Sequence, residues 1–151
     1  MKKLVSMLTL AMVLSASVAS ASVPAGQMNV GGVSYRDTPA QVAAVCGQPI
    51  KTKTSQKTYG EKTECKYANG LEVTFVDGVA QKIEVDDDSA LATAGGVKIG
   101  MDASVLQEVY GQPDQIHKND YIYYMDGRQD AGLVFEVKHG VVHEIECGRL
   151  H

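Results

Sequence analysis

One short phrase occurs twice in the chain and determines how the remaining residues can be divided. Residues 46–49 (Cys-Gly-Gln-Pro) and 110–113 (Tyr-Gly-Gln-Pro) end two similar segments, and the second phrase follows the first at an offset of 64 residues. The same offset relates residues 31–33 (Gly-Gly-Val) to residues 95–97 (Gly-Gly-Val). Self-similarity at a fixed period is typical of an internal duplication. The chain is therefore predicted to contain two copies of one structural unit.

Each phrase follows a segment that predicts a short helix. Thr38 is a favourable N-cap, Pro39 suits the first helical position, and Gln41 completes the spacing of a capping box. The glycine of the phrase can take positive φ beyond the helix end, and the proline prevents the helix from continuing. In the second copy Asp102 is the expected cap. Helices of two or three turns are marginal in water, so both are expected to dock on a sheet.

Segments in which apolar and polar residues alternate follow each helix and predict strands. The polar residues 51–57, between the first helix and these segments, are expected to form a solvated loop. Six strands are predicted, at residues 62–67, 71–76 and 79–85 in the first copy and 121–125, 133–138 and 141–147 in the second.

The turns of the first copy suggest how its strands align. Asn-Gly at residues 69–70 and Asp-Gly at residues 77–78 are strong hairpin signals. Three-residue loops would place Tyr67 opposite Leu71 and Phe75 opposite Val79, which brings the apolar side chains to one face.

The expected fold class is therefore α+β, with two tandem α-β-β-β repeats that form an antiparallel sheet with short helices on one face. The predicted organisation is a signal peptide at residues 1–21, a flexible amino-terminal segment at 22–30, repeat 1 at 31–86, a linker at 87–94 and repeat 2 at 95–151.

The first 21 residues have the pattern of an export signal. Lys2 and Lys3 precede a mostly apolar stretch at residues 4–14, and Ala-Ser-Ala at 19–21 is a small-x-small cleavage pattern. The apolar stretch is shorter than the roughly 20 residues that a membrane span needs. No cysteine directly follows it, so no lipid anchor is expected. The mature protein is expected to be periplasmic or extracellular, after cleavage near Ala21.

Charge excludes two classes of partner. The formal net charge of −4 becomes more negative when Lys2 and Lys3 are removed with the signal peptide. An acidic chain without a basic run is not expected to bind nucleic acid or an anionic membrane surface. No other segment is apolar and long enough to suggest a membrane span.

The three cysteines all lie in the predicted mature part, where an oxidising compartment favours disulfides. Cys46 at a helix end and Cys65 in the next strand are the expected pair. Cys147 lies at a strand position that Val85 takes in the first copy, so it is expected to be a buried small hydrophobic residue.

No catalytic residue, cofactor or metal site is predicted. His139 and His143 are four residues apart, but a turn and a strand do not bring such a pair together on one metal. His143 aligns with Gln81, an expected inward-facing position. The alternative hypothesis is a small metal- or thiol-dependent enzyme that works through His143, Glu144 and Cys147.

Differences between the copies indicate where a partner could bind. The outward positions of the first copy are mainly charged, whereas those of the second include aromatic and aliphatic residues. Aromatic side chains on an exposed sheet are typical interface anchors. The predicted interface consists of Tyr121, Tyr123, Tyr124, Val134 and Val142.

The repeated segment also resembles a known group. A capped short helix that ends in a Gly-x-Pro phrase and precedes antiparallel strands is similar to the exported SmpA/OmlA (BamE) repeats, and to the tandem-repeat β-lactamase inhibitor proteins. The residues that carry the resemblance are Thr38, Val42, Val45, Gly47 and Pro49, then Asp102, Leu106, Val109, Gly111 and Pro113. The resemblance implies the α-β-β-β fold and binding to other proteins, and it transfers no catalytic residue. The expected function is that of a non-enzymatic protein-binding module of the bacterial envelope; an envelope structural or ligand-binding role is a further alternative.

Overall fold

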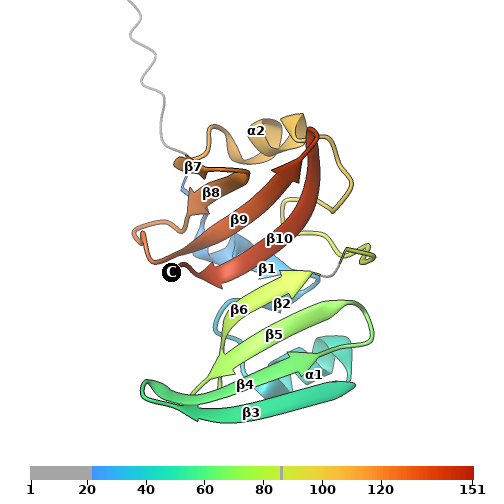
Figure 1. Ribbon diagram of the computed structural model, residues 1–151, viewed down its shortest axis with the longest axis vertical. Coiled ribbons are helices and arrows are strands. Elements are labelled where there is room, and N and C mark those ends of the chain that lie inside the picture. Colours follow the sequence, from blue (N-terminus) through green and yellow to red (C-terminus); the bar gives the residue numbers. More distant parts are fainter. Residues whose placement is uncertain (1–21, 86) are drawn as a thin grey trace, which may run out of the picture.

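The computed structural model describes residues 22–85 and 87–151; the predicted signal peptide and Asp86 lie outside the described residues. Eight antiparallel strands form one sheet in the order β3-β4-β5-β6-β10-β9-β8-β7 (Figure 1). The strands are β3 (Lys51–Lys57), β4 (Gly60–Lys66), β5 (Leu71–Val76), β6 (Val79–Val85), β7 (Gln115–His117), β8 (Asp120–Tyr124), β9 (Ala131–Lys138) and β10 (Val141–Arg149). With its two short helices, the fold is α+β, as expected.

One face of the sheet is covered and the other is open. Helices α1 (Pro39–Cys46) and α2 (Ser104–Tyr110) lie on the covered face, together with the small sheet of β1 (Asn29–Val30) and β2 (Val33–Ser34) and a 3₁₀ turn at Ala25–Gln27 (Figure 1). Between these elements and the sheet lies the core, which both helices enter through Val42, Leu106 and Tyr110. Within the described residues, neither helix is long and apolar enough to cross a bilayer.

Each helix precedes four strands rather than the three that the sequence predicts. Residues 51–57, expected to be a loop, form strand β3, which pairs with β4 along all its residues. The alternation of apolar and polar residues that indicates a strand is missing from β3, because both faces of this polar strand are exposed to solvent. Strand β7 was missed for the same reason, since all three of its residues are exposed. The prediction of three strands per helix is therefore wrong.

The predicted capping is confirmed for the first helix, and the prediction that Asp102 caps the second helix is wrong. The hydroxyl of Thr38 accepts a hydrogen bond from the backbone N–H of Gln41, and the Gln41 side chain accepts from the Thr38 N–H, which completes the capping box. In the second half the cap position belongs to Ala103. Asp102 lies one residue earlier and accepts from the Ser104 N–H at 2.9 Å.

The strand register differs from the prediction at one turn. The Tyr67 N–H donates to the Leu71 carbonyl, as expected, but Phe75 pairs with Ala80 and not with Val79. Asp77 and Gly78 both take positive φ, as in a two-residue hairpin, and a register shift follows.

The halves of the sheet join where β6 pairs with β10. The paired residues run from Val85 opposite Ile145 to Lys82 opposite Gly148. At this point a Cβ atom on Gly148 would collide with the Gln81 carbonyl oxygen, so the close approach of the two strands requires glycine there.

The segment at residues 22–30 is packed against the sheet, and the prediction that it is flexible is wrong. Val23 and Met28 are buried in the core. The Val23 N–H donates to the Tyr124 carbonyl at 2.9 Å, and the Val23 carbonyl accepts from the Asp126 N–H. Apolar burial and strand-like pairing therefore fix this segment. The expected linker at 87–94 also joins the core, because Thr93 is buried.

Candidate functional site

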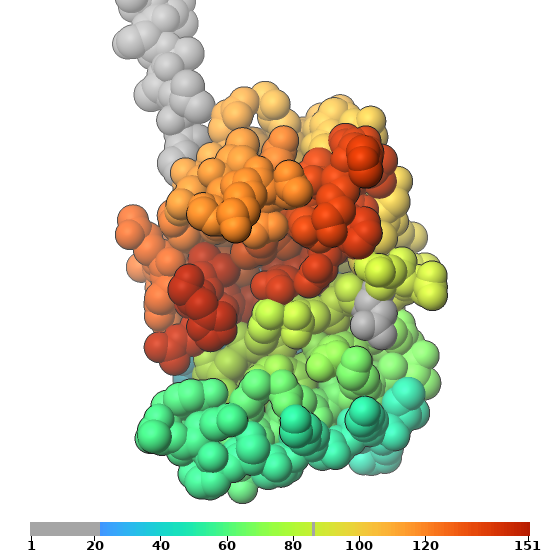
Figure 2. Space-filling view, in the orientation of Figure 1, coloured from blue at the N-terminus to red at the C-terminus, as the bar shows by residue number. Residues whose placement is uncertain are grey.

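The open face of the sheet is the face turned toward the viewer in Figure 2, with both helices on the other side (Figure 1). Alternation along the strands directs every second side chain to it. Most of the first-half positions carry charge, as predicted, while the second half mixes charged and apolar side chains. The open face presents Lys62, Glu64, Lys66, Glu72, Lys82, Glu84, Ile122, Tyr124, Val134, Glu136, Glu144 and Glu146.

A row of carboxylates crosses the middle of the open face. Glu72 lies directly opposite Glu84, and Glu84 lies opposite Glu146 on the next strand. Like charges in such positions destabilise a sheet. The ammonium group of Lys82 compensates part of this repulsion, since it lies 2.8 Å from both Glu84 Oε1 and Glu146 Oε1.

Two carboxyl groups of this region hold their protons more tightly than usual. Burial is the main cause of the raised pKa of Glu84, with the Lys82 ammonium acting in the opposite direction. Burial also raises the pKa of Glu144, and the neighbouring glutamates raise it further. Carboxylate oxygens of Glu84, Glu144 and Glu146 lie within 4.8 Å of one another. Because Lys82 already pairs with two of them, this cluster is an ion-pair network and not an open cation site.

His143 lies on the open face, and the prediction that it faces inward is wrong. A register shift between Val142 and Glu144 removes it from the normal alternation. Its Nδ1 lies 3.5 Å from Glu136 Oε2 and 3.8 Å from Asp87 Oδ1. This buried Nδ1 has no hydrogen-bond partner among the described residues.

The residues of the alternative enzyme hypothesis do not share a site. Cys147 is on the covered face with 0% of its surface exposed, and burial raises the pKa of its thiol to about 12. His143 and Glu144 are on the open face. The sheet therefore separates the thiol from the histidine and the carboxylate.

The predicted interface residues are divided between the two faces. Tyr124 and Val134 are half-buried on the open face. Tyr123 and Val142 are fully buried in the core, and Tyr121 packs against it. The outward placement of Val142 is thus wrong, because the register shift next to His143 turns this side chain inward.

Ile122 forms an apolar row on the open face together with Tyr124 and Val134. It lies directly opposite Val134, and both are half-buried. The Tyr124 hydroxyl donates to Gln115 Oε1 at 2.9 Å, which holds the ring on the open face. We call Ile122, Tyr124 and Val134 the apolar row.

A groove of about 780 Å³ hollows the first half of the open face. Strands β4, β5 and β6 form its floor, and the carboxy-terminal residues 149–151 form one wall. The Lys62 and Glu64 side chains pair inside it at 2.8 Å, which raises the pKa of Lys62 and lowers that of Glu64. Sequence reasoning missed this groove because its wall and floor are far apart in the chain.

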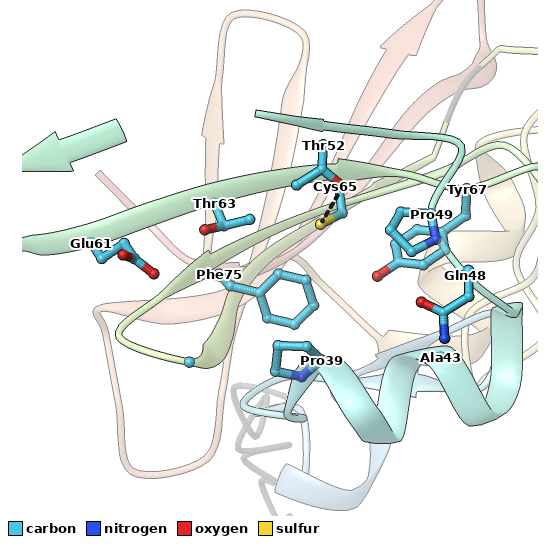
Figure 3. Close-up of a pocket in the computed structure, with 11 residues that line it drawn as sticks. Pro39, Ala43, Gln48, Pro49, Thr52, Glu61, Thr63, Cys65, Tyr67 and Phe75 are labelled. Atoms are coloured by element: carbon cyan, nitrogen blue, oxygen red, sulfur yellow. Dashed lines mark hydrogen bonds between the residues drawn. The ribbon is translucent and has the colours of Figure 1, made fainter. Parts of the chain in front are cut away.

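A second hollow, of about 280 Å³, lies on the covered face beneath α1. Figure 3 shows Tyr67 and Phe75 pointing toward the helix, opposite Pro39 and Ala43. The Cys65 thiol lines the same cavity. Burial, with Cys65 beside the ring, raises the pKa of Tyr67 to about 12.

The cysteines of the first half are free thiols, so the structure lacks the predicted disulfide between Cys46 and Cys65. Instead, Asn69 Nδ2 donates to Cys46 Sγ at 3.3 Å. Cys65 Sγ lies 3.8 Å from Thr52 Oγ1. The two sulfur atoms therefore contact different polar side chains, Asn69 for Cys46 and Thr52 for Cys65.

No protein-family model, curated protein or solved structure matches the chain.

Proposed function

We propose that the mature chain is an exported, non-enzymatic module that binds a protein partner on the open face. The observation that carries this proposal is the combination of a groove of about 780 Å³ and the apolar row on one uncovered sheet surface. Half-buried aromatic and aliphatic side chains on an uncovered sheet surface are typical of interfaces that exclude water at their centre.

The chemistry of the open face favours a partner with basic and apolar side chains. In the carboxylate row, Glu84 lines the groove, and Glu146 lies on β10, between β6 and the apolar-row strand β9. Glu84 and Glu144 both have raised pKa values. A basic group from a partner would stabilise the charged forms of these carboxyls. An apolar residue next to that basic group would contact the apolar row.

We also infer that the two halves are tandem repeats, related to the BamE-like group. Each half has a short helix, a glycine in positive φ after the helix and four antiparallel strands. Each half also has a register shift in its last hairpin. Repeats of this kind would explain why binding features differ between halves while the framework is shared.

A pull-down from the exported fraction tests the binding proposal. The double variant Tyr124→Ala, Val134→Ser removes most of the apolar row, and we expect it to lose a partner that the wild-type chain recovers. Val45→Ser is the matched control, because Val45 is 51% exposed on α1, away from the open face. Equal recovery by the wild type and the double variant would contradict the proposal.

The cavity beneath α1 supports a second candidate function, the binding of a small neutral ligand. Its lining is mostly apolar and includes Phe75, Tyr67 and two prolines; its polar members are Gln48, two threonines and Glu61. Ala43→Leu would fill this space. A ligand that raises the melting temperature of the wild type and not of Ala43→Leu would support this function, whereas an equal shift in both proteins would contradict it.

A further inference from the structure

Strand β3 is a long edge strand with one side of its backbone open. It pairs with β4 over residues 51–57 with no register shift, and it is the first strand in the sheet order (Figure 1). The opposite edge strand, β7, has only three residues. A row of unpaired N–H and C=O groups is a template to which another extended chain can add. The first half therefore has an edge that can accept a strand along seven residues, whereas the second half does not.

Side chains on β3 give this edge a positive charge. Lys51, Lys53 and Lys57 point to the open face, because they align with open-face positions of β4. None of the three forms a salt bridge with a residue that the structure describes. Glu64, which lies directly opposite Lys53, is already paired with Lys62 at 2.8 Å. Lys53 and Lys57 also act on the Glu64 carboxylate and help to lower its pKa. Because this one carboxylate is shared with Lys62, the edge keeps an excess of positive charge in a chain of net charge −4.

The same lysines discourage pairing with a second copy of the chain. Two β3 strands side by side would bring ammonium groups together, and edge lysines are a common protection against such pairing. Other features prevent any strand from pairing with an edge: a proline, a β-bulge or a charged side chain that points inward. Strand β3 has neither proline nor bulge, and its inward-facing residues are the neutral Thr52, Thr54 and Gln56.

We propose that β3 binds an extended acidic peptide segment of a protein partner, which adds to the sheet as a ninth strand. Carboxylates at alternate positions of the segment lie on one face of such a strand and meet Lys51, Lys53 and Lys57. Backbone hydrogen bonds to the edge supply sequence-independent affinity, and the lysines select the acidic pattern. This surface is distinct from the groove and the apolar row of the proposed function, so either can be correct without the other.

Synthetic peptides test the charge pattern. A labelled peptide of alternating glutamate and threonine is expected to bind the full mature chain in a fluorescence-anisotropy titration. The variant Lys53→Gln, Lys57→Gln should lose about tenfold in affinity, as expected for two surface charge contacts. Lys98→Gln, Lys118→Gln is the matched control, since both lysines are exposed outside β3, and it should bind like the wild type. Equal losses in the two double variants would overturn the proposal.

N-methylated peptides test strand addition itself. In a β-strand the N–H groups of all glutamates point to one edge and those of all threonines point to the other. Methylation of every glutamate nitrogen or of every threonine nitrogen should therefore give one isomer that binds and one that does not. Equal affinity of the two isomers would show that only charge attraction operates and would overturn the proposal.

Two further measurements distinguish the β3 edge from a membrane-binding surface and from the apolar row. Vesicles with anionic lipid should not bind the chain; lysine-dependent binding to them in place of the peptide would show a membrane-surface site and would also overturn the proposal. Tyr124→Ala, Val134→Ser should bind the acidic peptide like the wild type, because the apolar row is not part of this edge. Loss of peptide binding in that variant would contradict the placement of the peptide on β3.

Discussion

Aromatic rings fill the space beneath α2 in the second half of the molecule, whereas the equivalent space beneath α1 in the first half contains a cavity. The Tyr110 ring centroid lies 5.4 Å from that of Tyr123 and 5.5 Å from that of Phe135. The Tyr110 hydroxyl is 2.6 Å from Thr93 Oγ1. In the first half, Cys46 takes the position of Tyr110 in the repeated phrase, and about 280 Å³ remains open near Tyr67.

The two halves therefore differ in how tightly their cores are packed. The second half buries more aromatic surface, which contributes strongly to stability. The first half keeps a cavity, a surface groove and a positively charged edge. We infer that the tightly packed second half stabilises the fold enough for the first half to tolerate a cavity and a surface groove. Four predictions test this inference.

The largest effect is expected for Tyr110→Cys, which gives the second half the residue of the first. Loss of the buried ring should lower the free energy of unfolding by about 3–4 kcal/mol. Urea denaturation followed by circular dichroism measures this change. Cys46→Ala, the corresponding change in the first half, should cost less than about 1 kcal/mol because Cys46 is partly exposed. Similar losses from both variants would contradict the unequal contribution of the halves.

Thr93→Val should have the next largest effect. Thr93 is 4% exposed, contacts the Tyr110 hydroxyl and accepts a hydrogen bond from the Val97 N–H. Valine would remove the acceptor of the Val97 N–H and one of the two hydrogen-bond partners of the Tyr110 hydroxyl, which also bonds to the Gly95 backbone, at a cost of about 1–3 kcal/mol. Thr54→Val is the control on an exposed strand of the first half, where a change within about 0.5 kcal/mol is expected. If the thermal unfolding of both variants were alike, the role assigned to Thr93 would be wrong.

Ala43→Leu should stabilise the first half. Ala43 lines the cavity beneath α1, and added methyl groups there would gain about 1 kcal/mol by burying apolar surface. Ala44→Leu, one residue along the helix, adds the same groups to an exposed position and should have little effect. Urea denaturation of the two variants compares them directly. A loss of stability in Ala43→Leu would show that the first half is already packed to its limit.

The smallest effect is expected for Glu144→Gln, on strand β10, which joins the two halves by pairing with β6. Glu144 lies opposite Glu136, and removal of this repulsion should add about 0.5 kcal/mol to the free energy of unfolding at pH 7. The folded-state pKa of Glu144 is raised above 4.5, so the folded wild type binds more protons and loses stability as pH rises through that pKa. The gain in the variant should therefore be present at pH 7 and disappear below the unfolded pKa.

Unfolding curves at pH 7 and at about pH 4 measure this dependence, since an unperturbed glutamate has a pKa of about 4.3. Glu108→Gln, at an exposed position of α2, is the control. A gain that is equal at both pH values would contradict an electrostatic origin.

Features set by local chemistry could be predicted from the sequence. The capping box of Thr38 and Gln41 depends on residues three apart, and alternation within residues 71–76 reveals a half-buried strand. Strand β3 could not be predicted in this way, because it has no apolar face and its pairing with β4 stabilises it from outside.

The candidate site was only partly predictable. Tyr124 and Val134 were placed correctly by alternation, but one extra residue at His143 reverses the direction of Val142. Such a register shift depends on the partner strand and not on the residues themselves. The groove combines strands β4–β6 with residues 149–151, and no local pattern links segments so distant in sequence.

The position of β10 has a consequence for the order of folding. This last strand of the chain lies between β6 and β9, so the central pairing of the sheet joins residues about sixty positions apart. Non-local pairings of this kind form late, because a long loop must close first. As the chain emerges with its amino terminus leading, β6 and β9 keep exposed edges until β10 has been made. The carboxy-terminal strand therefore closes both halves in one step, and a chain truncated before β10 would retain two open edges prone to aggregation.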